Sequence, residues 1–353
     1  MTSPARSLAA LAAALLVPAV AAAGDAAMRL EVGGGVDTNP LRLSEEGVDR
    51  EGYVSAVAVG SFAGRASKLD LHGSLSLGAR SYPNAPDANL LASRLDFGIG
   101  RKLSRKLRLD LSFAARDLSE KGGWRSETGG RAGLELTLRA GRSRIGFGGG
   151  FESVAPRDAP LHPFEWYGPT AAVWITTPSG HSQAVRVGVD YGRRHYPAWP
   201  ETRDDDVVTA SAEWLRRRPV LLGLGYSFSA DFSNVAGGSH YRHRLTARAA
   251  VTLPGEVTVA MVGNLQRSEY PDEFTTDEPV LLTQQDAQNA LELRVSRPLT
   301  NRIELALTAA AYDSELNAGD VPRVPYAREV IGIALSWRAP GRPEVALPPS
   351  PGD

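Results

Sequence analysis

LDLHGSLSLGARSY, at residues 69–82, alternates apolar and polar side chains over its whole length. Successive side chains of an extended chain point to opposite faces, so Leu71 and Leu75 share one face while Ser76 and Arg80 share the other. A period of two over this length predicts a β-strand that is apolar on one side and polar on the other.

The same alternation recurs along the chain in segments of about ten residues or more. We predict strands at residues 28–38, 52–63, 67–82, 89–102, 106–117, 128–141, 143–154, 165–177, 181–196, 206–217, 219–232, 240–253, 256–269, 285–297, 301–314 and 326–338. Single-chain bacterial outer-membrane barrels have an even number of antiparallel strands. The sequence therefore predicts an all-β fold, a transmembrane antiparallel up-and-down β-barrel of about 16 strands over residues 24–338.

A soluble β-sandwich can show the same alternation, and the connections decide between the two folds. Every second connection is tight: 63–68, 102–106, 140–143, 178–181, 216–220, 254–256 and 297–301. The intervening connections are long: 39–51, 83–89, 118–127, 155–164, 197–205, 234–239, 270–284 and 314–325. A barrel in the outer membrane has short turns on its periplasmic side and longer loops outside. We therefore predict a membrane barrel whose first strand begins in the periplasm.

Charged residues follow the same division. The tight turns carry Arg65, Lys68, Arg101, Lys102, Arg105, Lys106, Arg142, Arg144, Arg216, Arg217, Arg218, Arg297 and Arg302. The long loops carry Glu45, Glu46, Asp49, Glu51, Asp87, Asp158, Glu201, Asp204, Asp205, Asp206, Asp272, Glu273, Asp277, Glu278 and Asp320. We expect one basic and one acidic rim.

Aromatic residues gather near the strand ends, where membrane barrels have their interfacial girdles. They are Tyr82, Trp166, Tyr167, Tyr191, Tyr241, Tyr312 and Tyr326 near the long loops, and Trp214 and Trp337 near the tight turns. We expect these rings at the level of the lipid headgroups.

The N-terminus has the features of a secretory signal peptide. Arg6 precedes an apolar run at 8–20, and the small residues at 21–23 supply a cleavage site. A transmembrane anchor is the alternative, but the run is shorter than the roughly 20 residues that a spanning helix needs. We expect residues 1–23 to direct export and the mature chain to reside in the outer membrane.

The composition excludes several classes of site. The chain contains no cysteine, which rules out disulfides, thiolate metal sites and lipidation at a cysteine. Its formal net charge is -1, and nothing indicates nucleic-acid binding. We expect no cofactor.

The segment Gly33-Gly34-Gly35-Val36-Asp37-Thr38-Asn39-Pro40 resembles a short G-Y-D-S-N-P type of segment. That segment ends the first strand in outer-membrane barrels of surface-polymer and surface-protein export systems. Val36 stands where those barrels have an aromatic residue. The last strand also departs from the usual pattern, because Trp337 is followed by residues 338–353. The resemblance implies an outer-membrane barrel with a role in export.

A hydrolase is a further possibility, since some outer-membrane barrels carry catalytic groups near the outer rim. The candidate residues near loop ends are His195, His240, His243, Asp204, Asp205, Asp206 and Ser239. Their spacing is not diagnostic, and we expect no catalytic residues. His240 and His243 point to opposite faces of an extended strand, which argues against a metal site.

Two further patterns have simple interpretations. The acidic loop 272–286 lacks a calcium-binding pattern, and its carboxylates would share divalent ions with the phosphates of surrounding lipopolysaccharide. The inward glycines of the G-F-G-G-G-F run at 146–151, like Gly223 and Gly225, would make room or let the wall bend.

The charged residues on the polar faces form the candidate functional set, the lining of a lumen. The main set is Arg80, Arg94, Arg108, Arg116, Arg139, Arg186, Arg244, Arg248, Asp70, Asp96, Asp110, Glu135, Asp190 and Glu304, joined by Arg29, Arg294, Glu31 and Glu292. Cations exceed acids only slightly, so we expect weak selectivity for anions. A mutually paired interior that merely keeps the lumen wet is the alternative.

The predicted function is translocation. A conduit for a surface polymer such as a polysaccharide, working with a periplasmic partner, is favoured, because the Pro-rich tail at 339–353 would project into the periplasm as a tether. A passive diffusion porin is the second possibility, and an outer-rim hydrolase or structural scaffold is the third. Outer-membrane lipid and lipopolysaccharide are the expected surroundings.

Overall fold

The described part of the chain is almost entirely β-strand. The computed structural model describes residues 25–40, 50–121, 126–157, 164–180, 182–199, 202–235, 238–269, 288–314, 316–318 and 327–339. The expected signal peptide at 1–23, the acidic loop 272–286 and the tail beyond Ala339 lie outside the described residues.

Seventeen strands and one short 3-10 helix make up the regular structure of the described residues. They are β1 (Asp25–Asp37), β2 (Glu51–Ala66), β3 (Leu69–Ser81), η1 (Pro86–Ala88), β4 (Leu90–Lys102), β5 (Leu107–Glu120), β6 (Glu127–Ala140), β7 (Ser143–Pro156), β8 (Trp166–Pro178), β9 (Gln183–Tyr196), β10 (Arg203–Arg216), β11 (Leu221–Ser233), β12 (His240–Leu253), β13 (Val257–Glu269), β14 (Gln288–Pro298), β15 (Ile303–Ser314), β16 (Leu316–Ala318) and β17 (Ala327–Arg338). Among the described residues no helix has the length and apolar character to cross a membrane.

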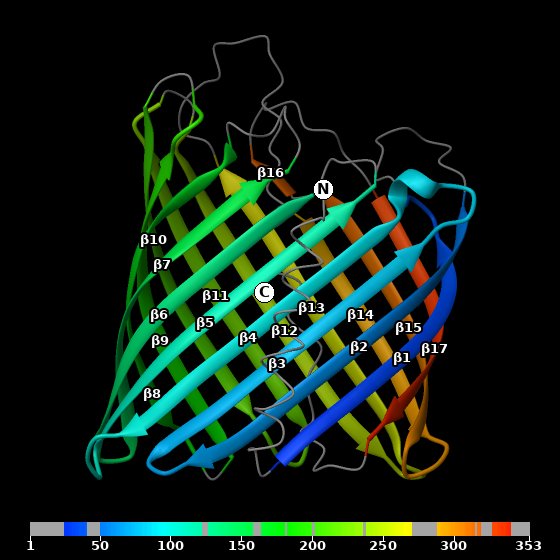
Figure 1. Cartoon of the computed structure of the whole chain (residues 1–353), viewed down its shortest axis with the longest axis horizontal. Coiled ribbons are helices and arrows are strands. Elements are labelled where there is room, and N and C mark those ends of the chain that lie inside the picture. Colours follow the sequence, from blue (N-terminus) through cyan, green and yellow to red (C-terminus); the bar gives the residue numbers. More distant parts are fainter. Residues whose placement is uncertain are drawn as a thin grey trace.

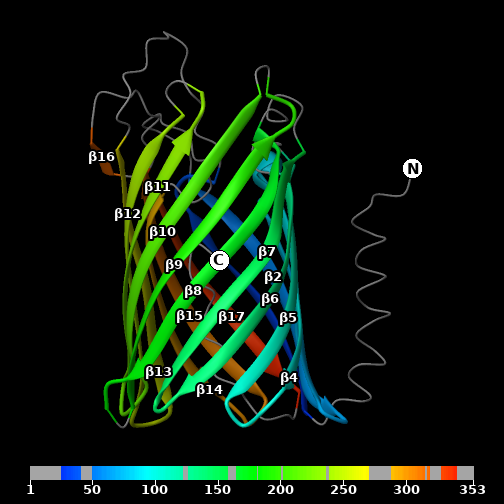
Figure 2. The same ribbon diagram turned by 90° about the vertical axis from the view of Figure 1, so that its left-hand side faces the viewer.

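Sixteen of these strands close into one antiparallel barrel, which confirms the predicted fold. Each long strand pairs with the next along the chain, and β17 pairs with both β15 and β1. Figures 1 and 2 show the tilted strands running around a continuous wall. Closure gives each of the sixteen long strands, in the described residues, a paired neighbour on both sides, as a span through lipid requires.

The predicted segments match the strands closely. Each of the sixteen overlaps one observed strand, and the ends differ by at most three residues. The short strand β16 was not predicted. Pairing of β14 with β13 ends at Asn264, and β16 lies parallel to β13 at Arg267–Glu269 beyond that point. Three residues are too few to show an alternation.

The connections sort by length between the two ends of the barrel. At one end, the short-turn end, β2–β3, β4–β5, β6–β7, β8–β9, β10–β11, β12–β13 and β14–β15 are joined by tight turns. Long connections join the strands at the opposite end, the long-connection end (Figure 1). Both Asp25 and Arg338 lie at the short-turn end. Gly141 occupies the β6–β7 turn with φ +63°, a conformation that favours glycine.

The wall has an apolar outer face and a more polar inner face. On β17 the outer residues Ile331 and Ile333 are 64% and 52% exposed, whereas the inner residues Val330 and Ala334 are 5% and 8% exposed. Contacts between distant strands identify the inner face, because Arg294 on β14 bonds Glu31 on β1 at 2.8 Å. Exposed apolar side chains around a closed barrel are suited to contact with lipid.

The aromatic prediction needs a correction. Tyr82, Trp166 and Tyr312 belong to the polar inner wall and not to a lipid-facing girdle. Tyr82 and Tyr312 bond carboxylates there, and Trp166 lies under the guanidinium of Arg194. Position along a strand does not determine which face a ring takes. The alternation does.

Candidate functional site

The structure places all the predicted lumen residues on inward positions of the strands. These are Arg80, Arg94, Arg108, Arg116, Arg139, Arg186, Arg244, Arg248, Asp70, Asp96, Asp110, Glu135, Asp190 and Glu304, together with Arg29, Arg294, Glu31 and Glu292. They share a face but differ in their surroundings. The inner wall contains two contrasting parts, the seam sector (inner faces of β14, β15, β17 and β1–β3) and the open sector (inner faces of β6–β9).

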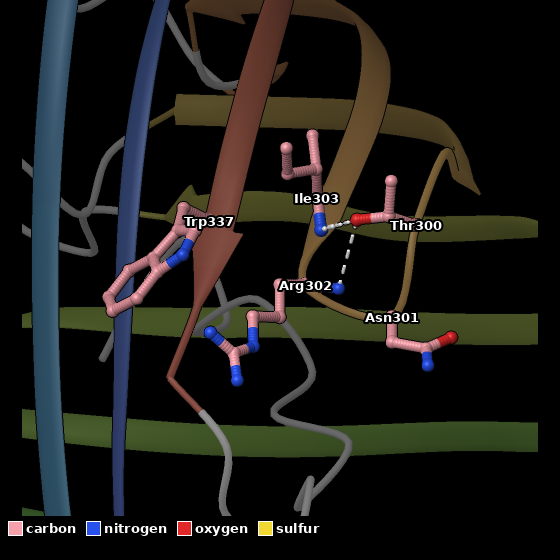
Figure 3. A pocket seen from close by; sticks show the side chains of 5 residues that line it. All are labelled: Thr300, Asn301, Arg302, Ile303 and Trp337. Atoms are coloured by element: carbon pink, nitrogen blue, oxygen red, sulfur yellow. Dashed lines mark hydrogen bonds between the residues drawn. The ribbon is translucent and has the colours of Figure 1, made fainter.

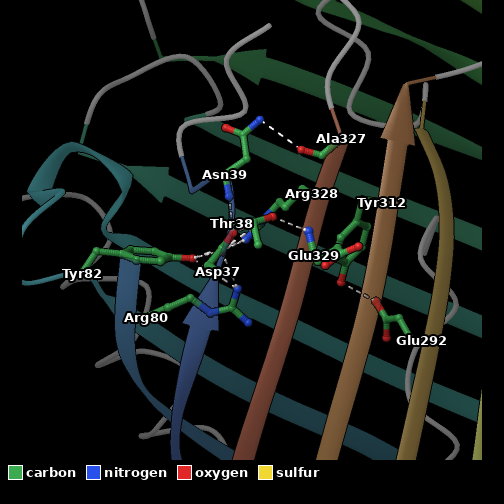
Figure 4. A network of polar contacts seen from close by, with 10 residues as sticks. All are labelled: Asp37, Thr38, Asn39, Arg80, Tyr82, Glu292, Tyr312, Ala327, Arg328 and Glu329. Atoms are coloured by element: carbon green, nitrogen blue, oxygen red, sulfur yellow. Dashed lines mark hydrogen bonds and ion pairs between the residues drawn. The ribbon is translucent and has the colours of Figure 1, made fainter. Parts of the chain in front are cut away.

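A buried polar cluster ties the first strand to the last in the seam sector (Figure 4). Asp37 is fully buried and accepts hydrogen bonds from Arg328 Nη2 at 2.6 Å and from the Tyr82 hydroxyl at 2.6 Å. The phenol of Tyr82 is the donor in this contact and the carboxylate of Asp37 is the acceptor. The cluster therefore joins β1, β17 and the end of β3.

The residues after Asp37 continue this connection along the seam. The Thr38 amide donates to the Glu329 carbonyl at 3.0 Å, and the Glu329 amide donates to Thr38 Oγ1 at 2.8 Å. Asn39 Nδ2 donates to the Ala327 carbonyl at 3.1 Å. The Asp-Thr-Asn part of the segment noted in the sequence thus fastens the closing strand pair.

Two glycines of the same segment allow β1 and β17 to approach. A Cβ added at Gly35 would lie 2.0 Å from the Ile331 carbonyl oxygen, and one at Gly33 would lie 2.6 Å from that of Ile333. Backbone atoms cannot move aside as a flexible side chain can. Glycine is therefore required at this part of the seam.

A second ion-pair network of the seam sector lies nearer the short-turn end. Glu31 accepts from Arg294 Nη2 at 2.8 Å and from the Ser336 hydroxyl at 2.7 Å. Glu304 joins Arg294 at 3.4 Å and also pairs with Arg338. Glu31, Glu304 and Arg294 are mostly buried. Their charges therefore neutralise one another, and little unpaired charge is exposed to a solute in the lumen.

Other inward charges are paired on β3, β4 and β5. Arg108 bonds Asp70 at 2.7 Å and Asp110 at 2.8 Å, and Arg94 bonds Asp96 at 2.9 Å. These short contacts hold the side chains to neighbouring positions on the wall.

The open sector is different, because most of its arginines are exposed; Arg194, which pairs with Asp231 at 3.3 Å, is the partly buried exception. Arg131, Arg139, Arg144 and Arg186 are all exposed on the inner face. The guanidinium of Arg186 lies 4.4 Å from the ring centroid of Trp174, a cation–π contact. Arg144 was counted with the tight-turn charges although it falls within the predicted strand at 143–154; it belongs to β7, opposite Arg139.

The inward glycines make room for large side chains on the wall. A Cβ at Gly146 would lie 2.1 Å from Cε2 of Trp174, and a Cβ at Gly223 would lie 2.6 Å from Nε of Arg248. Trp174 lies over Gly146 and donates its Nε1 hydrogen to Glu135 at 3.0 Å. Arg248 lies over Gly223 and pairs with Glu213.

The loop-end histidines are divided between the two faces of the wall. His195 and His243 are outside, where they contact Asp204 at 2.9 Å and the Tyr226 hydroxyl at 2.8 Å. His240 is inside and 8% exposed. Within the described ranges, no three His, Asp or Glu residues gather as metal ligands would. Because His240 lies on the opposite face from His195 and His243, the three histidines do not form one catalytic group.

Two pockets open beside the wall. One, of about 460 Å³, lies at the short-turn end and is lined by Thr300, Asn301, Arg302, Ile303 and Trp337 (Figure 3). Its main polar contacts belong to the turn itself, because Thr300 Oγ1 accepts from the amides of Arg302 and Ile303 at 3.2 and 3.0 Å. The other, of about 350 Å³, is lined by Phe151, Tyr167, Gly168, Pro169, Arg193, His195 and Asp204. Most of its lining side chains belong to the outer face, so neither pocket is part of the lumen.

Several residues of the inner wall were absent from the sequence-derived site. Asp37 lies within the quoted segment and Arg328 at an inward position of a predicted strand, so alternation alone could have placed both on the inner wall. Nothing in the sequence pairs them, since they are 291 positions apart. Trp174 was hidden among apolar neighbours on β8.

No family model matches the chain, and no curated protein matches it. Solved structures do resemble it. A bacterial polysaccharide outer membrane secretin has 10% identity and a TM-score of 0.45, with 88% of this chain and 98% of that chain covered. The anion-selective porin from Comamonas acidovorans has 10% identity and a TM-score of 0.47, with 89% and 99% covered. CdiB from Acinetobacter baumannii has 10% identity and a TM-score of 0.49, with 89% and 60% covered.

At such identities these likenesses concern the fold alone. The class follows from the structure itself: a closed barrel of sixteen antiparallel strands with an apolar outer wall and a charged inner wall is an outer-membrane β-barrel protein. The chain resides in the outer membrane.

Proposed function

We propose that this barrel is a translocation pore, serving as a conduit for a surface polymer such as a polysaccharide together with a periplasmic partner. The observation that carries the proposal is the exposed charge of the open sector inside a closed wall of sixteen strands. Exposed guanidinium groups are hydrated, and a barrel of this strand number is wide enough for an aqueous channel.

The orientation belongs to the same proposal. Short turns face the periplasm in outer-membrane barrels, so the short-turn end, with both Asp25 and Arg338, would lie there. The tail beyond Ala339 would then begin on the periplasmic side, where it could tether a partner. Lipopolysaccharide would surround the long-connection end.

Cysteine labelling tests the orientation, and the parent chain contains no cysteine. We expect a membrane-impermeant thiol reagent on whole cells to label Asp87→Cys and Asp277→Cys and to spare Arg217→Cys. Labelling at position 217 without labelling at 87 and 277 would reverse the orientation.

A passive diffusion porin is the second candidate. The paired inward charges, such as Arg108 with Asp70 and Asp110, favour it, because they are held at the wall without any partner protein. We propose a pore of either kind and not an enzyme, since the loop-end histidines lie on two faces. A scaffold remains the third candidate.

Gene deletion combined with planar-bilayer recording separates these functions. An export conduit must be closed without its partner, so the purified protein should conduct poorly or variably, and the deletion strain should lose a surface polymer without a change in small-solute uptake. Steady single-channel conductance with ion selectivity that shifts in Arg186→Ala and Arg248→Ala would favour the porin. Absence of conductance together with an intact surface polymer would reject both pores.

A further inference from the structure

Three arginines form a row across the inner wall of the open sector. Arg139 on β6 lies opposite Arg144 on β7, Arg144 lies opposite Thr176 on β8, and Thr176 lies opposite Arg186 on β9. At the β6 end of the row, the Arg139 amide donates to the carbonyl of Lys106, at the β4–β5 turn, at 2.7 Å. We call Arg139, Arg144 and Arg186 the arginine row.

The described residues give the arginine row no bonded carboxylate. Glu213 lies opposite Arg186 but pairs with Arg248. Asp190 is in electrostatic contact with Arg186, but it is exposed and shared with Arg131. Within the described residues, the Arg139 side chain donates to the Gly141 carbonyl, at 3.4 Å, and to no carboxylate. The row therefore keeps a net positive charge that the carboxylates of the wall neutralise only in part, at Arg186.

Such an arrangement has a cost in the empty barrel. Like charges directly opposite each other on neighbouring strands are destabilising, and Arg139 and Arg144 are in that relation. The inward arginines of the seam sector avoid this repulsion by pairing with carboxylates. In the open sector, a bound anion would reduce the repulsion between Arg139 and Arg144.

Arg186 is also prepared for such a ligand. Its guanidinium lies over the ring of Trp174, which is held in turn by Glu135 and fits into the space above Gly146. A cation–π contact uses none of the guanidinium N–H groups as donors to a carboxylate, so they are available for bonds to a carboxylate, sulfate or phosphate.

We infer that the arginine row is a binding site for an acidic polysaccharide that enters from the short-turn end. This deepens the proposed function and rests on it. Neighbouring strands lie about 4.8 Å apart, so the row from β6 to β9 spans roughly 15 Å. A single small anion cannot contact positions so far apart, whereas a chain with several charges engages them together, and linked contacts strengthen one another.

Cationic turns at the short-turn end add to the positive electrostatic potential of the arginine row. Arg105 and Lys106 of the β4–β5 turn and Arg142 of the β6–β7 turn are exposed, and no ion pair involves them among the described residues. A ring of one sign at a mouth raises the local concentration of the opposite charge. An acidic chain is thereby drawn towards the row.

Binding to the purified full-length barrel tests the inference without any need for transport. The probe is a fluorescently labelled oligogalacturonate, compared with a neutral maltodextrin of equal length and with free glucuronate, by fluorescence anisotropy. We expect the acidic oligomer to bind best, with an affinity that falls as salt rises because exposed charges are screened. Equal affinity for the neutral oligomer, or for free glucuronate, would overturn the inference.

The matched variants are Arg139→Gln/Arg144→Gln and Arg94→Gln/Arg108→Gln. Each removes two inward arginines, but the second pair is bonded to carboxylates. We expect the row variant to weaken binding by about tenfold, since exposed charge contacts contribute modestly and 1.4 kcal/mol corresponds to tenfold, and the control to weaken it clearly less. A row variant that binds as tightly as the parent, or no more weakly than the control, would contradict the site. Circular dichroism checks that each variant is folded.

Failure of this site and failure of the proposed function are distinguishable. If the barrel supports surface-polymer export in cells but shows no preference for the acidic oligomer, the proposed export function stands and the proposed binding site is rejected. A deletion strain with normal surface polymer rejects the conduit whatever the binding result.

Discussion

The seam sector and the open sector use the same residue types on the same face of one barrel, with opposite results. In the seam sector Arg328 is 7% exposed and its partner Asp37 is fully buried. In the open sector Arg139, Arg144 and Arg186 are exposed and lack bonded acids among the described residues. The difference teaches that an inward arginine in a barrel has no single role. Burial beside a carboxylate makes it part of the closure, and exposure without one makes it available to a solute.

The largest expected effect separates the two sectors by stability. Arg328→Ala leaves Asp37 buried without its ion-pair partner, and breaking a buried pair in this way costs about 3–5 kcal/mol. Arg139→Ala removes an exposed charge, and such surface changes stay within about 0.5 kcal/mol. Urea unfolding of both variants in the same lipid measures the contrast. Equal losses would show that the seam cluster does not fasten the barrel.

A second comparison sharpens the division between the outer and inner wall. Leu75 and Ser76 are neighbours on β3 that face lipid and lumen. Leu75→Arg should destabilise the barrel by about 2–4 kcal/mol at mid-membrane, whereas Ser76→Arg should be tolerated. Folding yield and unfolding free energy in lipid vesicles report both changes. Equal damage would overturn the register.

A smaller effect is expected within the open sector. Gly146→Ala would force Trp174 from its place beside Glu135, and overpacking of this kind costs about 1–3 kcal/mol. Gly148→Ala is the control, because its Cβ would meet Leu134 O at 3.6 Å and Ala172 Cβ at 3.7 Å, which are ordinary contacts. Unfolding free energies that do not differ would mean that Gly146 is not needed to seat Trp174.

The sequence predicts the strands and their faces well because both follow from local alternation. The residues of 69–82 separate into lipid-facing and inward sets without any knowledge of the neighbouring strands, and connection lengths supply the rest of the topology. Predicted ends shift by a few residues, because pairing with a neighbour and not composition decides where a strand stops.

Partnerships between distant residues could not be predicted in the same way. Asp37 and Arg328 meet only because the barrel closes. Tyr82 bonds Asp37 on the inner wall and does not lie among lipid headgroups, because the face of a residue, and not its position near a strand end, decides where its ring lies. Counting inward charges suggested weak anion selectivity, but a count does not show which arginines are paired. The division into two sectors is a property of the register between strands.

The most direct test of that division is the reactivity of single cysteines on the inner wall. Thr176→Cys places a thiol within the arginine row, and Ser336→Cys places one at a fully buried position of the seam sector. In the purified barrel, position 176 should react readily, and faster with a sulfonate-bearing than with a trimethylammonium-bearing methanethiosulfonate, because the row attracts anions. Position 336 should stay unreactive to both. Similar rates at the two positions, or a faster reaction of position 176 with the cationic reagent, would contradict the account.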